Sequence, residues 1–204
     1  MSLWAIVPVK PLRKAKSGLS EVLSEDERAL MIFTMLSQTL RTLKEVPAFG
    51  HILVVSSDSA ALAMAREFGA RTLQEDGQTG LKIALKRAVV VAKMYNASEV
   101  LILSADLPLL TRRDIEKLLS LAKSPPSVVI APDRHGAGTN AIYLNPPDVI
   151  DCTLGAGSNE VNLKKAKSKG IEVEECHLTT LGLDIDQPED LALLRQIEAF
   201  HVNN

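Results

Sequence analysis

With 204 residues, of which 46% are hydrophobic, the chain can bury a core of its own, and we expect one domain over residues 1–204. A formal net charge of −2 and a pI near 6.1 exclude a general attraction to nucleic acid or to an anionic membrane surface. The two cysteines are far apart in the sequence, which predicts a protein without disulfides or a zinc site. We find no signal-peptide core at the N-terminus and no apolar run long enough to cross a bilayer, so we expect a cytoplasmic protein without a membrane span.

The first half of the chain alternates predicted strands and helices. Strands are expected at residues 3–9, 51–56, 71–74 and 100–103. Ser24 and Glu27 form a capping box, and apolar side chains at helical spacing then continue the helix until Pro47. Further helices are predicted at residues 60–68, at residues 81–94 and after the capping pair Thr111 and Asp114.

The second half is less regular but keeps this alternation. Strands are predicted at residues 127–131 and 141–144, with a glycine-rich loop between them. Residues 172–178 alternate apolar and polar side chains, as expected of an antiparallel or edge strand. Helices are predicted at residues 158–169 and from the DIDQPED segment to about Phe200. This order predicts a three-layer α/β/α fold with a mostly parallel sheet and an antiparallel or edge strand in its second half.

One apolar run, VLILSADLPLL, ends at a carboxylate, Asp106, just before Pro108. Open α/β sheets bind ligands at the carboxyl ends of their strands, so an acid that a buried strand delivers there is a candidate functional group. The alternative is that Asp106 only starts the turn that leads to the next helix. Two further loops, at residues 10–20 and 76–80, should lie along the same edge of the sheet.

The loop after the first strand is rich in cations. It carries Lys10, Arg13, Lys14 and Lys16 within seven residues. Lys10 follows the strand end at Pro8 almost directly, so its ammonium should project over the edge of the sheet, where it could neutralise a polyphosphate. Arg13 and Lys14 are more simply explained as a solvated face. The loop lacks the glycine pattern of a Walker loop or of a dinucleotide-binding motif, which argues against a P-loop NTPase and a nicotinamide-dependent dehydrogenase.

Asp184 and Asp186 supply two further carboxylates near the end of the chain. Mg²⁺ prefers oxygen ligands and often takes only one or two of them from carboxylates, with the rest from phosphates and water. Asp106 and these two acids, converging beside the cationic loop, would meet that need. The alternatives are that Asp184 is a solvent-exposed turn residue and that Asp186 forms a capping box with Glu189. Because Asp184 has no such capping duty, we rank it the better ligand.

Five segments together resemble one known family. In chain order they are VPVKPLRKAKSGLS, SADLPLL, PDRHGAGTNAIYL, LGAGSN and LDIDQPEDL. Their order and spacing are similar to those of the phospholactate guanylyltransferases of coenzyme F-420 biosynthesis, over nearly the whole chain. The DLP and DxDxPEDL patterns are shared with the wider nucleotidyltransferases of the glycosyltransferase-like α/β fold. The VPVKPL and GTNA segments therefore carry the narrower assignment.

The resemblance implies a Mg²⁺-dependent enzyme that transfers GMP from GTP to 2-phospho-L-lactate. The products would be pyrophosphate and lactyl-diphospho-guanosine. Because the acceptor is already a phosphate anion, no general base or protein nucleophile is required, and catalysis reduces to alignment and charge neutralisation at the α-phosphorus. The implied partners are GTP and a small phosphorylated carboxylic acid.

The resemblance also implies roles for individual residues. The catalytic groups would be Lys10, Lys16 and Asp106; the nucleotide contacts Pro8, Lys10, Lys16, Gly77 and Gly80; the metal ligands Asp106, Asp184 and Asp186; and the acceptor contacts Thr139, Asn140, Gly155 and Ser158. Backbone N–H groups at residues 155–158 precede a predicted helix and could bind an anionic group of the acceptor. Competing explanations are that Ser158 is a plain N-cap and that Gly77 and Gly80 only allow a turn.

Four positions depart from the family pattern. They are Gly18, Lys82, Asn159 and Asn162, where an arginine, an asparagine, an aromatic residue and a histidine are usual. They leave phosphoenolpyruvate, or another three-carbon phospho-acid, open as the acceptor, and also a non-catalytic nucleotide-binding protein of the same fold. A sugar transferase of this fold would favour a tight Asp-x-Asp, which Leu107 and Pro108 do not provide after Asp106. Edge strands in the second half favour a homodimer that covers them.

Overall fold

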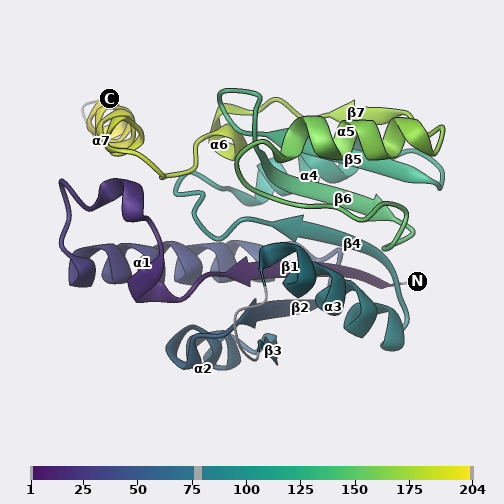
Figure 1. Ribbon diagram of the computed structural model, residues 1–204, viewed down its shortest axis with the longest axis horizontal. Helices are drawn as coiled ribbons and strands as arrows, with labels where there is room; N and C mark the ends of the chain where they lie inside the picture. The colour runs from purple at the N-terminus through teal and green to yellow at the C-terminus, as the bar shows by residue number, and fades with distance from the viewer. Residues whose placement is uncertain (1, 76–79, 203–204) are drawn as a thin grey trace.

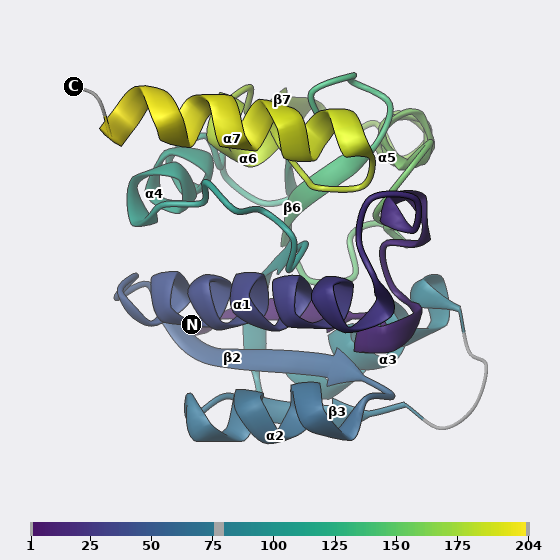
Figure 2. The same ribbon diagram turned by 90° about the vertical axis from the view of Figure 1, so that its left-hand side faces the viewer.

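The computed structural model of the chain describes residues 2–75 and 80–202, and it contains a seven-stranded sheet between two layers of helices (Figures 1 and 2). In spatial order the strands are β3 (Arg71–Gln74), β2 (Phe49–Ser56), β1 (Ser2–Val9), β4 (Ala97–Leu103), β6 (Thr139–Asn145), β5 (Ser127–Pro132) and β7 (Val173–Glu175). β6 runs antiparallel to both of its neighbours, and the other paired strands are parallel. The predicted α/β/α fold with a mostly parallel sheet is confirmed.

Helices cover both faces of this sheet. They are α1 (Glu25–Lys44), α2 (Ser59–Glu67), α3 (Leu81–Met94), α4 (Arg112–Ser120), α5 (Ser158–Ser168), α6 (Thr179–Gly182) and α7 (Pro188–Val202). Along β1, Ala5 and Val7 pack into a core shared with α1, α2, α4 and α7, whereas Trp4 and Ile6 pack into a second core shared with α3 and α5. None of the helices that the structure describes combines the length and the apolar character needed to cross a membrane.

The two predicted capping boxes are present at the starts of α1 and α4. Ser24 Oγ accepts a hydrogen bond from the backbone N–H of Glu27, and Thr111 Oγ1 accepts one from that of Asp114, each at 3.3 Å. In both cases the acidic side chain returns a bond to the backbone N–H of the cap residue. These local signals therefore fixed the helix starts as expected.

The second half of the sheet differs from the prediction in detail. The strand expected at residues 172–178 is only the three-residue β7, which lies at the sheet edge and runs parallel to β5. The edge position of β7 is as predicted, and the antiparallel strand is β6, an interior strand whose first six residues are all buried. Residues 133–138 join β5 to β6, and a link of that length is too short for the crossover that parallel neighbours require.

The direction of β6 decides which segments meet at the carboxyl edge of the parallel strands. β1 and β4 both end there, and β6 begins there, with Ala141 opposite Leu103. The backbone N–H of Ser104 continues this pairing by donating to the carbonyl of Asn140 at 2.8 Å. The segments after β1 and β4 and the start of β6 are thus brought to one place.

Candidate active site

A cavity lies at this edge of the sheet. Its lining includes eight of the residues singled out from the sequence: Pro8, Lys10, Lys16, Asp106, Asn140, Gly155, Asp184 and Asp186. They come from the end of β1 and the segment after it, the turn after β4, the start of β6, the segment before α5 and the segment between α6 and α7. The fold therefore gathers these residues from five separate parts of the chain.

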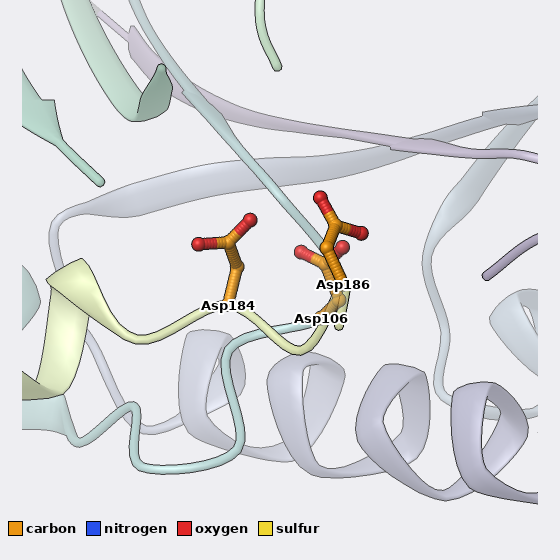
Figure 3. A group of neighbouring side chains, drawn as sticks. All are labelled: Asp106, Asp184 and Asp186. Atoms are coloured by element: carbon orange, nitrogen blue, oxygen red, sulfur yellow. The ribbon is translucent and has the colours of Figure 1, made fainter. Parts of the chain in front are cut away.

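Three carboxylates form the acidic side of the cavity (Figure 3). One oxygen from each of Asp106, Asp184 and Asp186 lies within 4.8 Å of the other two. Lys16 sits among them, with its Nζ hydrogen-bonded to Asp106 Oδ2 and, at 2.7 Å, to Asp186 Oδ1. The Lys16 side chain is only 7% exposed. A buried ammonium thus balances part of the negative charge of the cluster.

The ionisation of these groups reflects their mutual contacts. Burial acts to raise the pKa of Asp106, but the adjacent charge of Lys16 outweighs burial and holds this pKa below its ordinary value. Burial likewise acts to lower the pKa of Lys16, and the charges of Asp106 and Asp186 outweigh it, so this pKa is raised. Burial, together with the negative charge of Asp106, raises the pKa of Asp184 to about 6. Asp184 is therefore the acid whose negative charge is least compensated.

The donor set suits a hard divalent cation. Three carboxylates supply only oxygen ligands, which match the preference of Mg²⁺. Asp106 Oδ1 is buried and has no hydrogen-bond partner among the described residues, so it is an oxygen with a free coordination position. The raised pKa of Asp184 is also the expected mark of a carboxylate that lacks its counter-ion. The residues present thus fit a magnesium ion.

The loop that carries the cations is more ordered than its sequence indicated. Short 3-10 turns, η1 (Leu12–Lys14) and η2 (Ser17–Leu19), bury Leu12 and Leu19. Between these turns Lys16 adopts a left-handed backbone conformation, with φ 57° and ψ 41°. Lys10 lines the cavity from an exposed position. The sequence favoured Lys10 as the principal cation, whereas the structure places Lys16 against the carboxylates.

Asn140 connects the start of β6 to the acidic cluster. Its Nδ2 donates to the carbonyl oxygens of Leu181 and Gly182, at 2.9 and 3.3 Å, and to Asp184 Oδ1 at 3.2 Å. Asn140 is 3% exposed, so these contacts fix the segment that carries Asp184. The sequence assigned Asn140 to the acceptor, and the structure adds contact with a candidate metal ligand.

Thr139 and Ser158 are buried and bound to one another. The backbone N–H of Thr139 donates to Ser158 Oγ at 2.8 Å, and Ser158 Oγ donates to the carbonyl of Gly155 at 2.5 Å. Neither residue is part of the cavity lining, so their contact with an acceptor stays a prediction. The N-cap of α5 is Gly157, at φ 72°, and not Ser158, which is the first residue of the helix. The alternative interpretation of Ser158 as a plain N-cap is therefore wrong.

Of the two glycines expected near the nucleotide, only Gly80 lies among the described residues. Gly80 is the N-cap of α3 and is exposed, next to Leu81, which lines the cavity. Gly77 lies outside the described residues. Their contact with a nucleotide stays a prediction.

The capping box proposed for Asp186 and Glu189 is replaced by a different arrangement. Asp190 Oδ2 accepts from the backbone N–H groups of Asp186 and Gln187, at 3.0 and 2.7 Å. Asp190 Oδ1 is held by the guanidinium of Arg134. Sequence inspection missed Asp190 because the residue three positions before it is Gln187, which is not one of the usual N-cap residues. The Asp186 side chain is thus left to contact Lys16.

Three of the four departures from the family pattern have a structural explanation. A Cβ atom at Gly18 would lie 2.5 Å from the carbonyl oxygen of Asp186, so glycine allows the Lys16 loop to approach that segment. Asn162 Nδ2 donates to Thr139 Oγ1 at 3.1 Å, and Asn159 Nδ2 donates to the carbonyl of Gly136 at 3.0 Å. These side chains support the region around the start of β6. Lys82 forms an exposed ion pair with Asp151 at 3.4 Å and remains without a role at the site.

Comparison with known proteins extends over nearly the whole chain. The family model described as guanylyl transferase CofC like matches residues 3–197. The phosphoenolpyruvate guanylyltransferase of Rubrobacter xylanophilus is 41% identical over 194 residues, covering 95% of this chain and 94% of the relative. The 2-phospho-L-lactate guanylyltransferase of Methanocaldococcus vulcanius is 35% identical over 187 residues, covering 91% and 81%.

Solved structures support the same fold at lower sequence identity. A putative nucleotide-diphospho-sugar transferase from Desulfovibrio desulfuricans has a TM-score of 0.74 at 20% identity, covering 95% of this chain and 87% of the other. A nucleotidyl transferase from Methanothermobacter has a TM-score of 0.70 at 14% identity, covering 100% and 99%. At these identities the likeness concerns the fold alone, and the match over residues 3–197 identifies the family. The chain belongs to the CofC-like guanylyl transferases.

Proposed function

We propose that this guanylyl transferase moves GMP from GTP to a three-carbon carboxylic acid that carries a phosphate on C2, with 2-phospho-L-lactate as the acceptor predicted from the sequence. The product would be lactyl-diphospho-guanosine, an intermediate of coenzyme F-420 biosynthesis. The observation that carries the proposal is the cluster of three carboxylates with Lys16, placed at the carboxyl edge of the sheet in a chain of this family.

The reaction needs no protein nucleophile. A phosphate oxygen of the acceptor attacks the α-phosphorus of GTP, the bond from the α-phosphorus to the bridging oxygen breaks, and pyrophosphate leaves with its electron pair. The attacking oxygen is already anionic, so no proton has to be removed in this step. The work of the protein is to align the two substrates and to neutralise charge on the transferred group.

In this proposal the acidic cluster holds the metal ion, and the lysines add positive charge near the triphosphate. Asp106, Asp184 and Asp186 would hold Mg²⁺, which when bound supplies positive charge at the phosphates. Lys16 contacts Asp106 Oδ2 and Asp186 Oδ1 and leaves Asp106 Oδ1 free, so its ammonium would lie beside a bound cation and add positive charge near the triphosphate. Lys10, exposed in the cavity lining, would contact the same anion from the open side.

Phosphoenolpyruvate is the second candidate acceptor. It is favoured by the relative that is 41% identical, which is named for that substrate. Both acids place a phosphate on the carbon next to a carboxylate, and they differ in whether that carbon is planar or tetrahedral. Contacts to the phosphate and to the carboxylate would therefore bind either acid. The shape of the pocket around C2 would determine which of the two acids binds.

A substrate matrix tests the proposal. Four nucleoside triphosphates are each combined with 2-phospho-L-lactate, phosphoenolpyruvate or phosphoglycerate, with Mg²⁺ present, and pyrophosphate release is measured. The expected result is release with GTP and one of the two C2-phosphorylated candidates. Thermal stabilisation by GTP without pyrophosphate from any acid would instead favour the non-catalytic nucleotide-binding alternative.

A further inference from the structure

Asp190 is a buried carboxylate beside the site, and both of its oxygens are fully engaged. It is 5% exposed and lies in the first turn of α7. Oδ2 accepts the backbone N–H groups of Asp186 and Gln187, at 3.0 and 2.7 Å. Oδ1 accepts two N–H groups of Arg134, from Nε at 3.0 Å and from Nη2 at 2.6 Å. The arrangement joins a guanidinium, through one carboxylate, to the backbone of a candidate metal ligand.

Arg134 is itself held in a structured loop. Its backbone N–H donates to the carbonyl of Gly182 at 2.8 Å, just before the segment of Asp184. The neighbouring Asp133 carboxylate accepts backbone N–H groups from three residues of the same loop, between 2.7 and 3.0 Å. The loop between β5 and β6 therefore presents the guanidinium from a fixed position.

Asp190 contacts the backbone N–H of Asp186, whereas the loop that carries Lys16 lies against the backbone carbonyl of Asp186. A Cβ atom at Gly18 would lie only 2.5 Å from the Asp186 carbonyl oxygen, so these two backbone segments are in close contact. By contrast, the Asp186 side chain is 57% exposed, compared with 18% for Asp106. Apart from its bond to Lys16, this exposed side chain has little packing around it, so the placement of its carboxylate depends strongly on its backbone.

We infer that Asp190, held by Arg134, is a positioning residue that fixes Asp186 for metal binding. This inference rests on the proposed magnesium-dependent function. Charge-assisted bonds from a guanidinium orient the carboxylate, which in turn orders two successive backbone N–H groups. Replacing Asp190 would free the backbone of Asp186 and leave Arg134 without its partner.

The test compares Asp190→Asn and Arg134→Met with Glu189→Gln. Glu189 is an exposed acid in the same turn of α7, so its replacement controls for loss of charge there. Mn²⁺ is titrated by electron paramagnetic resonance with GTP present and acceptor absent, so that no turnover occurs. The GTP KM at saturating Mg²⁺ is measured in parallel, because a general loss of structure would change both quantities.

The expected result is an approximately tenfold weaker Mn²⁺ affinity in Asp190→Asn, with a GTP KM within about twofold of the wild type. Arg134→Met should weaken Mn²⁺ binding less than Asp190→Asn does. A variant that carries both substitutions should bind Mn²⁺ no more weakly than Asp190→Asn alone, because Arg134 acts through Asp190. Glu189→Gln should bind Mn²⁺ like the wild type. If Asp190→Asn does not fold, Arg134→Met decides alone, and a weakening of about threefold or more supports the inference.

Unchanged Mn²⁺ affinity in a folded Asp190→Asn, or in Arg134→Met when only that variant folds, would overturn the positioning role while leaving the metal site intact. A wild-type protein that binds no Mn²⁺ and releases pyrophosphate without any divalent cation would overturn the metal-dependent function itself, and the inference with it. The two failures are distinguished by the behaviour of the wild type.

Discussion

Replacing Asp184 with asparagine should make the metal-free protein more stable at neutral pH. The pKa of the Asp184 carboxyl is raised to about 6, because burial and the charge of Asp106 oppose its ionisation. A carboxyl whose pKa is higher in the folded chain stabilises the fold below its unfolded pKa and loses that contribution as the pH rises through about 6. Asparagine removes the titrating group and keeps an oxygen that can accept the bond from Asn140.

The size of the effect follows from the difference in pKa. A pKa of about 6 in place of the ordinary 3.8 corresponds to at most about 3 kcal/mol of stability lost at pH 7.5. Partial contact with solvent reduces this to about 1–2 kcal/mol. For a chain of this length, Asp184→Asn should therefore raise Tm by roughly 2–8 °C without metal.

Chemical denaturation with urea, in the presence of a chelator, measures the difference in unfolding free energy between Asp184→Asn and the wild type. The difference should fall to about half or less between pH 7.5 and pH 4.5, since the wild-type carboxyl becomes protonated. Added Mg²⁺ should stabilise the wild type and leave the variant nearly unchanged. Glu189→Gln, an exposed control, should lie within about 0.5 kcal/mol of the wild type. A variant that is less stable than the wild type at pH 7.5 without metal would refute the reasoning.

Three further results are expected. Lys10→Met should lower kcat by a larger factor than it weakens GTP affinity, measured by steady-state kinetics and equilibrium binding, and equal losses would limit Lys10 to ground-state binding. Gly18→Ala should cost about 1–3 kcal/mol in urea denaturation, because its Cβ would lie 2.5 Å from the Asp186 carbonyl oxygen, and an unchanged midpoint would contradict that close contact. The Mg²⁺ concentration for half-maximal rate should rise as the pH falls through about 6, since protons compete with metal at Asp184, and a pH-independent value would exclude Asp184 as a ligand.

Local patterns in the sequence were enough for most of the fold. Capping boxes and apolar periodicity located α1 and α4, and the uniformly apolar run before Asp106 correctly indicated a buried strand, β4. The position of Asp106 at the carboxyl edge followed from a general property of parallel sheets. The direction of β6 is not visible in its own composition, because a strand buried on both faces looks the same whether it runs parallel or antiparallel. The signal that could have found it is the short link from β5, which leaves no room for a parallel crossover.

The site itself was predictable as a set of residues and less so as a set of contacts. Asp106, Asp184 and Asp186 were expected to converge, and they do. Lys16 could not be ranked above Lys10 from the sequence, because the inward direction of Lys16 depends on a left-handed backbone between two short turns. Contacts across distant segments, such as those of Arg134 with Asp190 and of Asn140 with Asp184, leave no local signal in one sequence.

Pyrophosphate release by Asp106→Asn tests the central claim most directly. Asparagine keeps the size of the side chain but removes the carboxylate that contacts Lys16 and, in the proposed mechanism, Mg²⁺. With GTP, Mg²⁺ and 2-phospho-L-lactate or phosphoenolpyruvate, the wild type should release pyrophosphate. The folded variant should release it at least about a hundredfold more slowly. A folded Asp106→Asn protein with a rate close to that of the wild type would contradict the assignment of this cluster as the active site.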